Sequence, residues 1–128
     1  MKVYIAINSS KIGSNEIASI IKDNLSRTIN IGDKKTYSTA LYDYNSCEYS
    51  FYPKSCLISD TIDLITNFID KNIMNFQILH KMDDSLAISL RFIIELDGES
   101  TPDSFFNSQF LFLLSQIKAD LDIDMYYK

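Results

Sequence analysis

The stretch that most constrains the fold is 119–127, where acidic and apolar residues alternate without a break before a closing pair of tyrosines. In a β-strand, successive side chains point to opposite faces of the sheet. The alternation therefore predicts a strand with an apolar face made of Leu121, Ile123, Met125 and Tyr127. Its other face would be acidic and made of Asp120, Asp122, Asp124 and Tyr126. A strand with a complete apolar face is suited to the interior of a sheet.

Four further strands follow from similar patterns. Apolar residues alternate over 2–9 and over 85–97, where Ile93-Ile94 interrupts the alternation as a β-bulge or a strand end would. Two runs rich in tyrosine and other β-forming residues, 36–45 and 47–53, predict a hairpin with its turn at Asn45-Ser46.

Helices are predicted where apolar residues recur at helical spacing behind a capping serine. The first spans 14–25 and the second spans 59–71. Asn72 is expected to interrupt the second helix. Residues 73–82 fit either a further helical piece or a short strand, because their apolar residues match both periods. Asp83-Asp84 is expected to form a turn.

A third helix is expected to end at Lys118 and to begin either at Thr101-Pro102-Asp103 or near Asn107. The element order is then β-α-β-β-α-β-α-β. We predict a single α+β domain over residues 1–128, with one mostly antiparallel sheet of about five strands and three helices packed on one face.

The charge is distributed unevenly along the chain. Residues 1–82 contain eight acidic and nine Lys or Arg residues, whereas residues 83–128 contain nine acidic and three. The net charge of −5 therefore arises in the last third of the sequence. Such a field repels nucleic acid and favours association with basic partners, although an acidic end also serves simply to keep a protein soluble.

Nothing in the sequence indicates a membrane or secreted protein. The longest apolar run, Phe110–Leu114, is far shorter than the ~20 residues that span a bilayer. The start of the chain has the alternation of a strand rather than the pattern of a signal peptide. Cys47 and Cys56 match no metal or redox spacing, so we expect free thiols in a cytoplasmic protein.

No catalytic motif is present, so we expect a non-enzymatic protein without a cofactor. His80 is the only histidine, and neither a nucleophile elbow nor a phosphate-binding glycine loop accompanies it. Aspartates two apart on a strand lie ~6.6 to 7 Å from each other, so Asp97 or Glu99 would have to join them to hold a metal ion. We therefore favour no metal and an acidic docking face.

The predicted docking face consists of the acidic strand residues and their neighbours in the predicted fold. Tyr126 would be its aromatic anchor, with Tyr42 or Tyr44 as further candidates. A basic partner would relieve the repulsion between carboxylates aligned along one strand. The predicted partner-binding residues are Asp120, Asp122, Asp124 and Tyr126, with Asp97 and Glu99 contributing if they lie nearby.

The sequence from Ile117 to Tyr126 resembles the close of a bacterial family of small proteins, the DUF4279 family, which ends in a helix, a small-residue step and an aspartate-rich strand finishing in tyrosine. Glu16-Ile17 and the step Ile31-Gly32-Asp33-Lys34 are also similar to that family. Proteins of this kind occur among bacterial immunity proteins, so the resemblance implies an inhibitor that neutralises a cognate toxin domain. Such toxins are often basic nucleases.

Two other functions remain open from the sequence. One is a stand-alone binding or regulatory module, monomeric or paired as a homodimer through its open sheet face or edge strand. The other is a small hydrolase, which would have to depend on His80.

Overall fold

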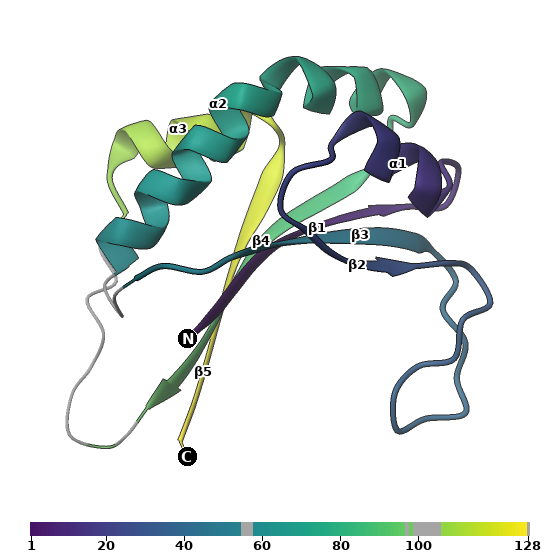
Figure 1. Cartoon of the computed structure of the whole chain (residues 1–128), viewed down its shortest axis with the longest axis horizontal. Helices are drawn as coiled ribbons and strands as arrows, with labels where there is room; N and C mark the ends of the chain where they lie inside the picture. The colour runs from purple at the N-terminus through teal and green to yellow at the C-terminus, as the bar shows by residue number, and fades with distance from the viewer. Residues whose placement is uncertain (55–57, 97, 99–105, 128) are drawn as a thin grey trace.

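A computed structural model describes residues 1–54, 58–96, 98 and 106–127 (Figure 1). The described residues form the predicted α+β order of five strands and three helices. In chain order the elements are β1 (Lys2–Ser9), α1 (Ser14–Ile20), β2 (Leu25–Ile29), β3 (Asn45–Phe51), α2 (Ile58–Met82), β4 (Ala87–Leu96), α3 (Ser108–Gln116) and β5 (Ala119–Tyr127).

The five strands make one sheet in the order β2-β3-β1-β4-β5. Neighbouring strands are antiparallel except β4 and β5, which run parallel. The first four strands with α1 and α2 form the split β-α-β arrangement known as ferredoxin-like. Helix α3 is the crossover that brings β5 alongside β4 in the same direction, as a parallel pair requires. β5 therefore lies at an edge of the sheet.

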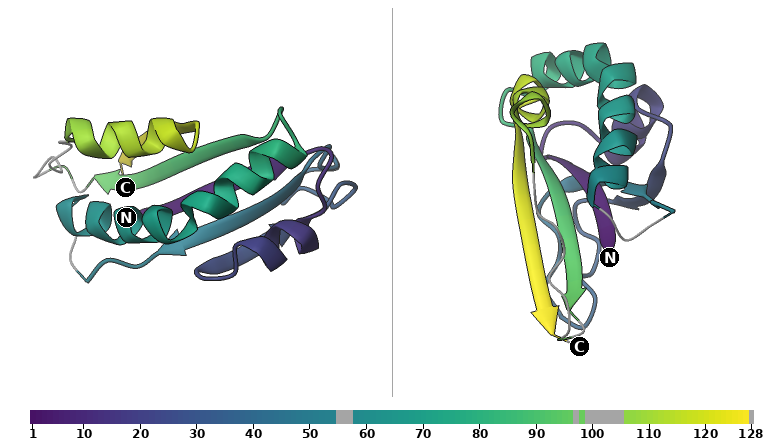
Figure 2. Two further views of the ribbon diagram at one scale, coloured as in Figure 1. Left: turned by 90° about the horizontal axis from the view of Figure 1, so that it is seen from above. Right: turned by 90° about the vertical axis from the view of Figure 1, so that its left-hand side faces the viewer.

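All three helices lie over the same face of the sheet (Figure 2). The core forms between this face and the helices, because alternate strand residues turn their apolar side chains towards α2. On β1 these are Val3, Ile5 and Ile7, each at most 1% exposed. They meet a continuous stripe on α2 that includes Ile65, Ile69, Phe76 and Leu79. The opposite, open face of the sheet carries the 30–44 loop at the β2–β3 end (Figure 1).

The partner of β3 is not the predicted one. Residues 25–29, expected to be helix end and irregular connection, form β2 and pair with β3, whereas 36–44 form a loop closed by hydrogen bonds between Tyr42 and both Gly32 and Asp33. Tyr37 in this loop is fully exposed. The predicted hairpin at 36–53 is therefore wrong in its first strand, because that run buries no apolar face against the helices.

Helix α1 ends at Ile20, earlier than the predicted residue 25. The following residue, Ile21, has extended backbone, and its buried carbonyl accepts a hydrogen bond from the Tyr49 hydroxyl at 2.7 Å. Asn24 then donates its side-chain amide to the Ser50 carbonyl, and its own carbonyl accepts from the Ser50 amide. These contacts direct the chain away from the helix and into β2.

Helix α2 is continuous through Asn72, so the predicted interruption is wrong. The Asn72 side-chain amide donates to the Phe68 carbonyl at 2.9 Å, and its oxygen accepts from Asn75. Because both polar groups find partners within the helix, a buried asparagine is tolerated there. The alternative of a strand over 73–82 is excluded by the same helix.

The remaining boundaries are close to prediction. β4 keeps an unbroken register with both neighbours and continues to Leu96, so the bulge or strand end expected at Ile93-Ile94 is wrong. Ile93 lies on the open face. Helix α3 begins at the later of the two predicted starts, where the Asn107 side chain caps it by accepting from the Phe110 amide at 2.9 Å. The alternative start at 101–103 lies outside the described residues.

Candidate partner-binding site

β5 presents the predicted two faces, but at the sheet edge rather than in the interior. Its parallel register places Asp122 beside Arg91 and Ile123 beside Phe92, whose side chain is buried under the helices. Asp120, Asp124 and Tyr126 share the face of Asp122. The alternation is thus confirmed, and the interior position that it allowed is wrong, because α3 returns the chain to the outer side of β4.

The apolar face of β5 is covered only at its start. Leu121 packs against the core, whereas Ile123 is 38% exposed, Met125 45% and Tyr127 78%. Figure 2 shows the cause: the last parts of β4 and β5 extend beyond the helices. The edge strand therefore exposes apolar side chains on one face and carboxylates on the other.

The three aspartates are not electrostatically equivalent. Asp122 accepts hydrogen bonds from two nitrogens of Arg91, Nε and Nη2, both at 3.2 Å. The third, Nη1, donates to the Tyr4 hydroxyl at 3.3 Å. Among the described residues, neither Asp120 nor Asp124 has an ion-pair partner within 4.0 Å. The uncompensated charge of the strand is therefore carried by its first and third aspartates.

Of the six predicted partner-binding residues, four are brought together along β5: Asp120, Asp122, Asp124 and Tyr126, all exposed. Asp97 and Glu99 lie outside the described residues. No group of three His, Cys, Asp or Glu side chains in the described part of the chain is arranged to hold a metal ion. We name the exposed residues Asp120, Asp122, Asp124, Tyr126, Ile123 and Met125 the β5 strip.

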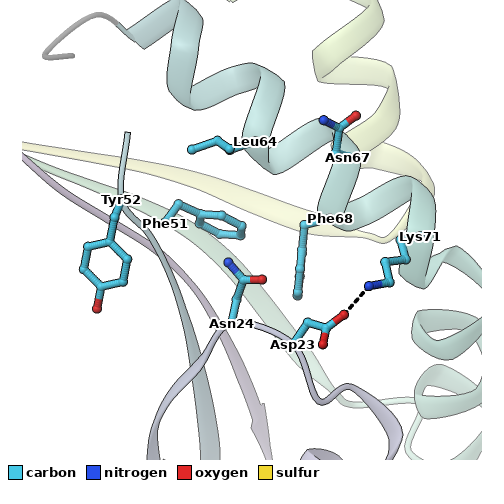
Figure 3. Close-up of a pocket in the computed structure, with 8 residues that line it drawn as sticks. All are labelled: Asp23, Asn24, Phe51, Tyr52, Leu64, Asn67, Phe68 and Lys71. Atoms are coloured by element: carbon cyan, nitrogen blue, oxygen red, sulfur yellow. Dashed lines mark hydrogen bonds and ion pairs between the residues drawn. The ribbon is translucent and has the colours of Figure 1, made fainter. Parts of the chain in front are cut away.

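A hollow of about 360 Å³ lies on the helix side, between α2 and the segment leading into β2 (Figure 3). Phe51 and Phe68 project into it from β3 and α2, with ring centroids 5.2 Å apart in an edge-to-face arrangement. At its rim, Lys71 forms an ion pair with Asp23. Its aromatic floor belongs to the core and its two charges neutralise each other, so it is a surface depression rather than a reactive site.

The side chains that could have supported catalysis have structural contacts. The His80 ring nitrogen Nε2 lies 2.8 Å from the Ile117 carbonyl, which joins the end of α2 to the end of α3. Cys47 is a free, buried thiol that donates to the Ser14 carbonyl at 3.2 Å. Burial raises its pKa to about 11, which suppresses the reactive thiolate. Cys56 lies outside the described residues.

The open face holds charged residues that were not among the predicted site residues. Arg27, Glu48 and Arg91 point from three strands towards a second hollow of about 320 Å³. The sequence indicates that Arg91 lies on the open face, since Ser89 and Arg91 occupy the polar positions of an otherwise apolar strand. It does not indicate this for Arg27, because residues 25–29 were not predicted to form a strand.

No family model, curated protein or solved structure matches this chain. Within the described residues, no helix combines the length and apolar character needed to cross a membrane.

Proposed function

We propose that this protein is a non-enzymatic inhibitor that binds a basic strand of a partner along β5, and that the partner is a cognate bacterial toxin domain. The observation that carries the binding mode is the exposed nine-residue edge strand β5. An edge strand offers unpaired backbone N–H and C=O groups to an added strand. The toxin as partner is supported by the resemblance of residues 117–126 to the DUF4279 family.

The chemistry of the β5 strip specifies the partner strand. Lys or Arg at alternate positions would lie opposite Asp120 and Asp124, whose charges have no partner among the described residues. Cross-strand pairs of opposite charge contribute roughly 0.2–1 kcal/mol each. Apolar residues between the basic ones would cover Ile123 and Met125 on the other face. The partner strand is therefore one that alternates basic and apolar residues.

The same charges disfavour the alternative of a homodimer through β5. Two β5 strands related by a two-fold axis and paired over their full length would be centred on Ile123. That register sets Asp122 opposite Asp124 twice, and like charges directly opposite each other destabilise a strand pair. Pairing with a basic strand removes this repulsion instead of adding to it.

The first test is co-expression with the protein encoded beside this one, followed by size-exclusion chromatography and calorimetry at two salt concentrations. We expect a one-to-one complex that salt weakens, because the recognition involves exposed charges. Asp120→Lys/Asp124→Lys should slow association about tenfold or more at low salt. The matched control is Asp63→Lys/Asp70→Lys, which makes the same change of net charge on the exposed side of α2.

A capped synthetic peptide alternating Lys and Val tests the binding mode itself. It should bind, whereas the same peptide with Glu in place of Lys, or with alternate backbone nitrogens methylated, should not. Equal effects of the β5 and α2 charge reversals would remove β5 as the site. A constitutive homodimer that persists in Asp124→Lys would favour the self-associating module.

A further inference from the structure

The hollow on the open face of the sheet lies apart from the exposed edge of β5 and has a different character. Its floor is made of small residues, Ala6 on β1, Ser46 on β3 and Ser89 on β4. Because these side chains are short, the larger residues around them enclose a volume of about 320 Å³. That volume is at the lower end of the range for small-molecule sites.

Charged groups of both signs surround this floor. Arg27 on β2 lies directly opposite Glu48 on β3 in the register of the sheet, and Arg91 reaches the hollow from β4. Two arginines and one glutamate line the hollow, although the protein as a whole carries a net charge of −5. Because Arg91 is paired with Asp122, the hollow has one cation and one anion without an ion-pair partner among the described residues, Arg27 and Glu48.

Arg27 and Glu48 do not neutralise each other. Among the described residues, neither forms an ion pair within 4.0 Å. The Arg27 guanidinium instead makes one long hydrogen bond of 3.4 Å to the Tyr42 hydroxyl. A cation and an anion thus stand side by side at the hollow, each with hydrogen-bonding capacity unused.

The walls are aromatic and are held in place from outside the hollow. Tyr42 and Tyr44 pack edge to face with centroids 5.6 Å apart, and both come from the 30–44 loop. The base of this loop is fixed because the Asn45 side chain accepts from the Ile31 amide and donates to the Ile12 carbonyl. The tyrosine hydroxyls can each donate and accept a hydrogen bond at the mouth of the site.

Asn8 adds an unsatisfied group at the same place. It lines the hollow, and its Oδ1 is the one buried side-chain oxygen or nitrogen of the described residues that lacks a hydrogen-bond partner. Such groups are uncommon in native structures unless a ligand, water or function accounts for them.

From this arrangement we propose that the hollow binds a small zwitterion of the amino-acid type. The carboxylate of the ligand is held by the Arg27 guanidinium, which offers paired donors to a planar carboxylate. The ammonium group is held by the adjacent Glu48 carboxylate. The remaining polar part of the ligand faces Tyr42 and Tyr44. The residues that would bind the ligand are not part of the β5 strip, so this proposal does not depend on the proposed inhibitor function.

The test uses the purified protein alone. Each standard L-amino acid is screened at millimolar concentration by two-dimensional NMR, and the amino acid giving the largest shifts is compared with its amide and its N-acetyl derivative. We expect the zwitterion to bind and both derivatives to bind at least about tenfold more weakly, because each lacks one charge that makes a charged hydrogen bond.

Two variants test which residue binds each end of the ligand. Arg27→Gln should weaken binding of the zwitterion on the order of tenfold to a hundredfold. Glu48→Gln should weaken it similarly but leave the weaker binding of the N-acetyl derivative unchanged. Lys54→Gln, an exposed cation just beyond β3, is the matched control and should change neither affinity.

The proposal is overturned if no amino acid shifts the resonances of residues lining the hollow while the protein remains folded. It is equally overturned if acetate or inorganic phosphate binds as well as the best amino acid, because the Glu48 carboxylate would then have no role.

Discussion

The Asp83 side chain offers the sharpest test of how this fold is held together. It is 1% exposed and lies after the last residue of α2. Its Oδ2 accepts from the Ser9 hydroxyl at 2.6 Å, and its Oδ1 accepts from the Ser85 amide at 3.0 Å and the Ser85 hydroxyl at 2.6 Å. One carboxylate therefore joins the end of β1 to the turn before β4.

Replacing Asp83 by Asn should be costly although the two side chains have the same shape. The Ser9 oxygen already accepts from the Lys11 and Ile12 amides at 3.1 and 2.9 Å, so it has to donate to residue 83. An asparagine amide nitrogen therefore meets a donor in either orientation: the Ser9 hydroxyl in one, and the Ser85 amide in the other. Hydrogen bonds to a charged group contribute about 1.5–3 kcal/mol each, and an unpaired buried donor costs about 1–3 kcal/mol.

We expect Asp83→Asn to lower the free energy of unfolding by about 3 kcal/mol, which corresponds to a loss of ~10 °C in Tm for a chain of this size. Urea unfolding followed by circular dichroism measures the loss. The neighbouring residue supplies the control, because the Asp84 side chain is 93% exposed and only pairs with Lys11 at 3.6 Å. Asp84→Asn should cost less than about 1 kcal/mol.

The pH dependence provides a second measurement. Hydrogen bonds from Ser85 and then Ser9 lower the pKa of Asp83 below its ordinary value. A carboxyl group whose pKa is lower in the folded state stabilises the fold above its unfolded pKa of about 4, and that contribution is lost as the pH falls through the folded pKa. Stability of the native protein should therefore fall more steeply below about pH 4 than that of Asp83→Asn. Equal stability of the Asp83 and Asp84 variants at neutral pH, or identical acid profiles of native and variant protein, would refute the reasoning.

Two core positions give further tests. Tyr49→Phe removes the 2.7 Å hydrogen bond to the fully buried Ile21 carbonyl, so we expect a loss of about 1–2 kcal/mol in urea unfolding with little change in the slope; a neutral outcome would mean that this carbonyl finds another donor. In a Cys56→Ser background, Cys47 should react with iodoacetamide at pH 8 at least about a hundredfold faster in urea than in the native state, because burial raises its native pKa to about 11. Mass spectrometry measures the rate, and rapid native alkylation would contradict the burial.

The sequence predicts well those elements whose apolar period is complete. β1 alternates through Val3, Ile5 and Ile7, and its observed bounds, Lys2–Ser9, match the expected ones. Helix α2 has a long apolar stripe, and only its continuity through Asn72 was missed. Asparagine has a low intrinsic preference for a helix interior, but here its side chain is hydrogen-bonded to Phe68 and Asn75, one turn away on either side.

β2 could not be found from periodicity, since Ile29 is the only one of its five residues that is buried. An edge strand of this kind is held by its ladder to β3 and by Asn24, which has a positive φ of 67° and bonds reciprocally with the Ser50 backbone. Tyr42 and Tyr44 then take a different role from the predicted one. They line the open face from a loop instead of forming a strand.

Four of the six predicted partner-binding residues lie along β5, but their electrostatic differences were not predicted. The sequence predicts carboxylates aligned along one strand, and of these Asp122 is held by Arg91. Asp83, in the same acidic last third, is buried and stabilises the fold. Reversing Asp122 would therefore break a contact within the sheet and place a lysine beside an arginine, so a loss of binding in that variant would have two explanations. Asp120 and Asp124 have no such contact among the described residues. Reversing the charges of these two side chains therefore tests binding to the proposed partner without breaking an ion pair of the described fold.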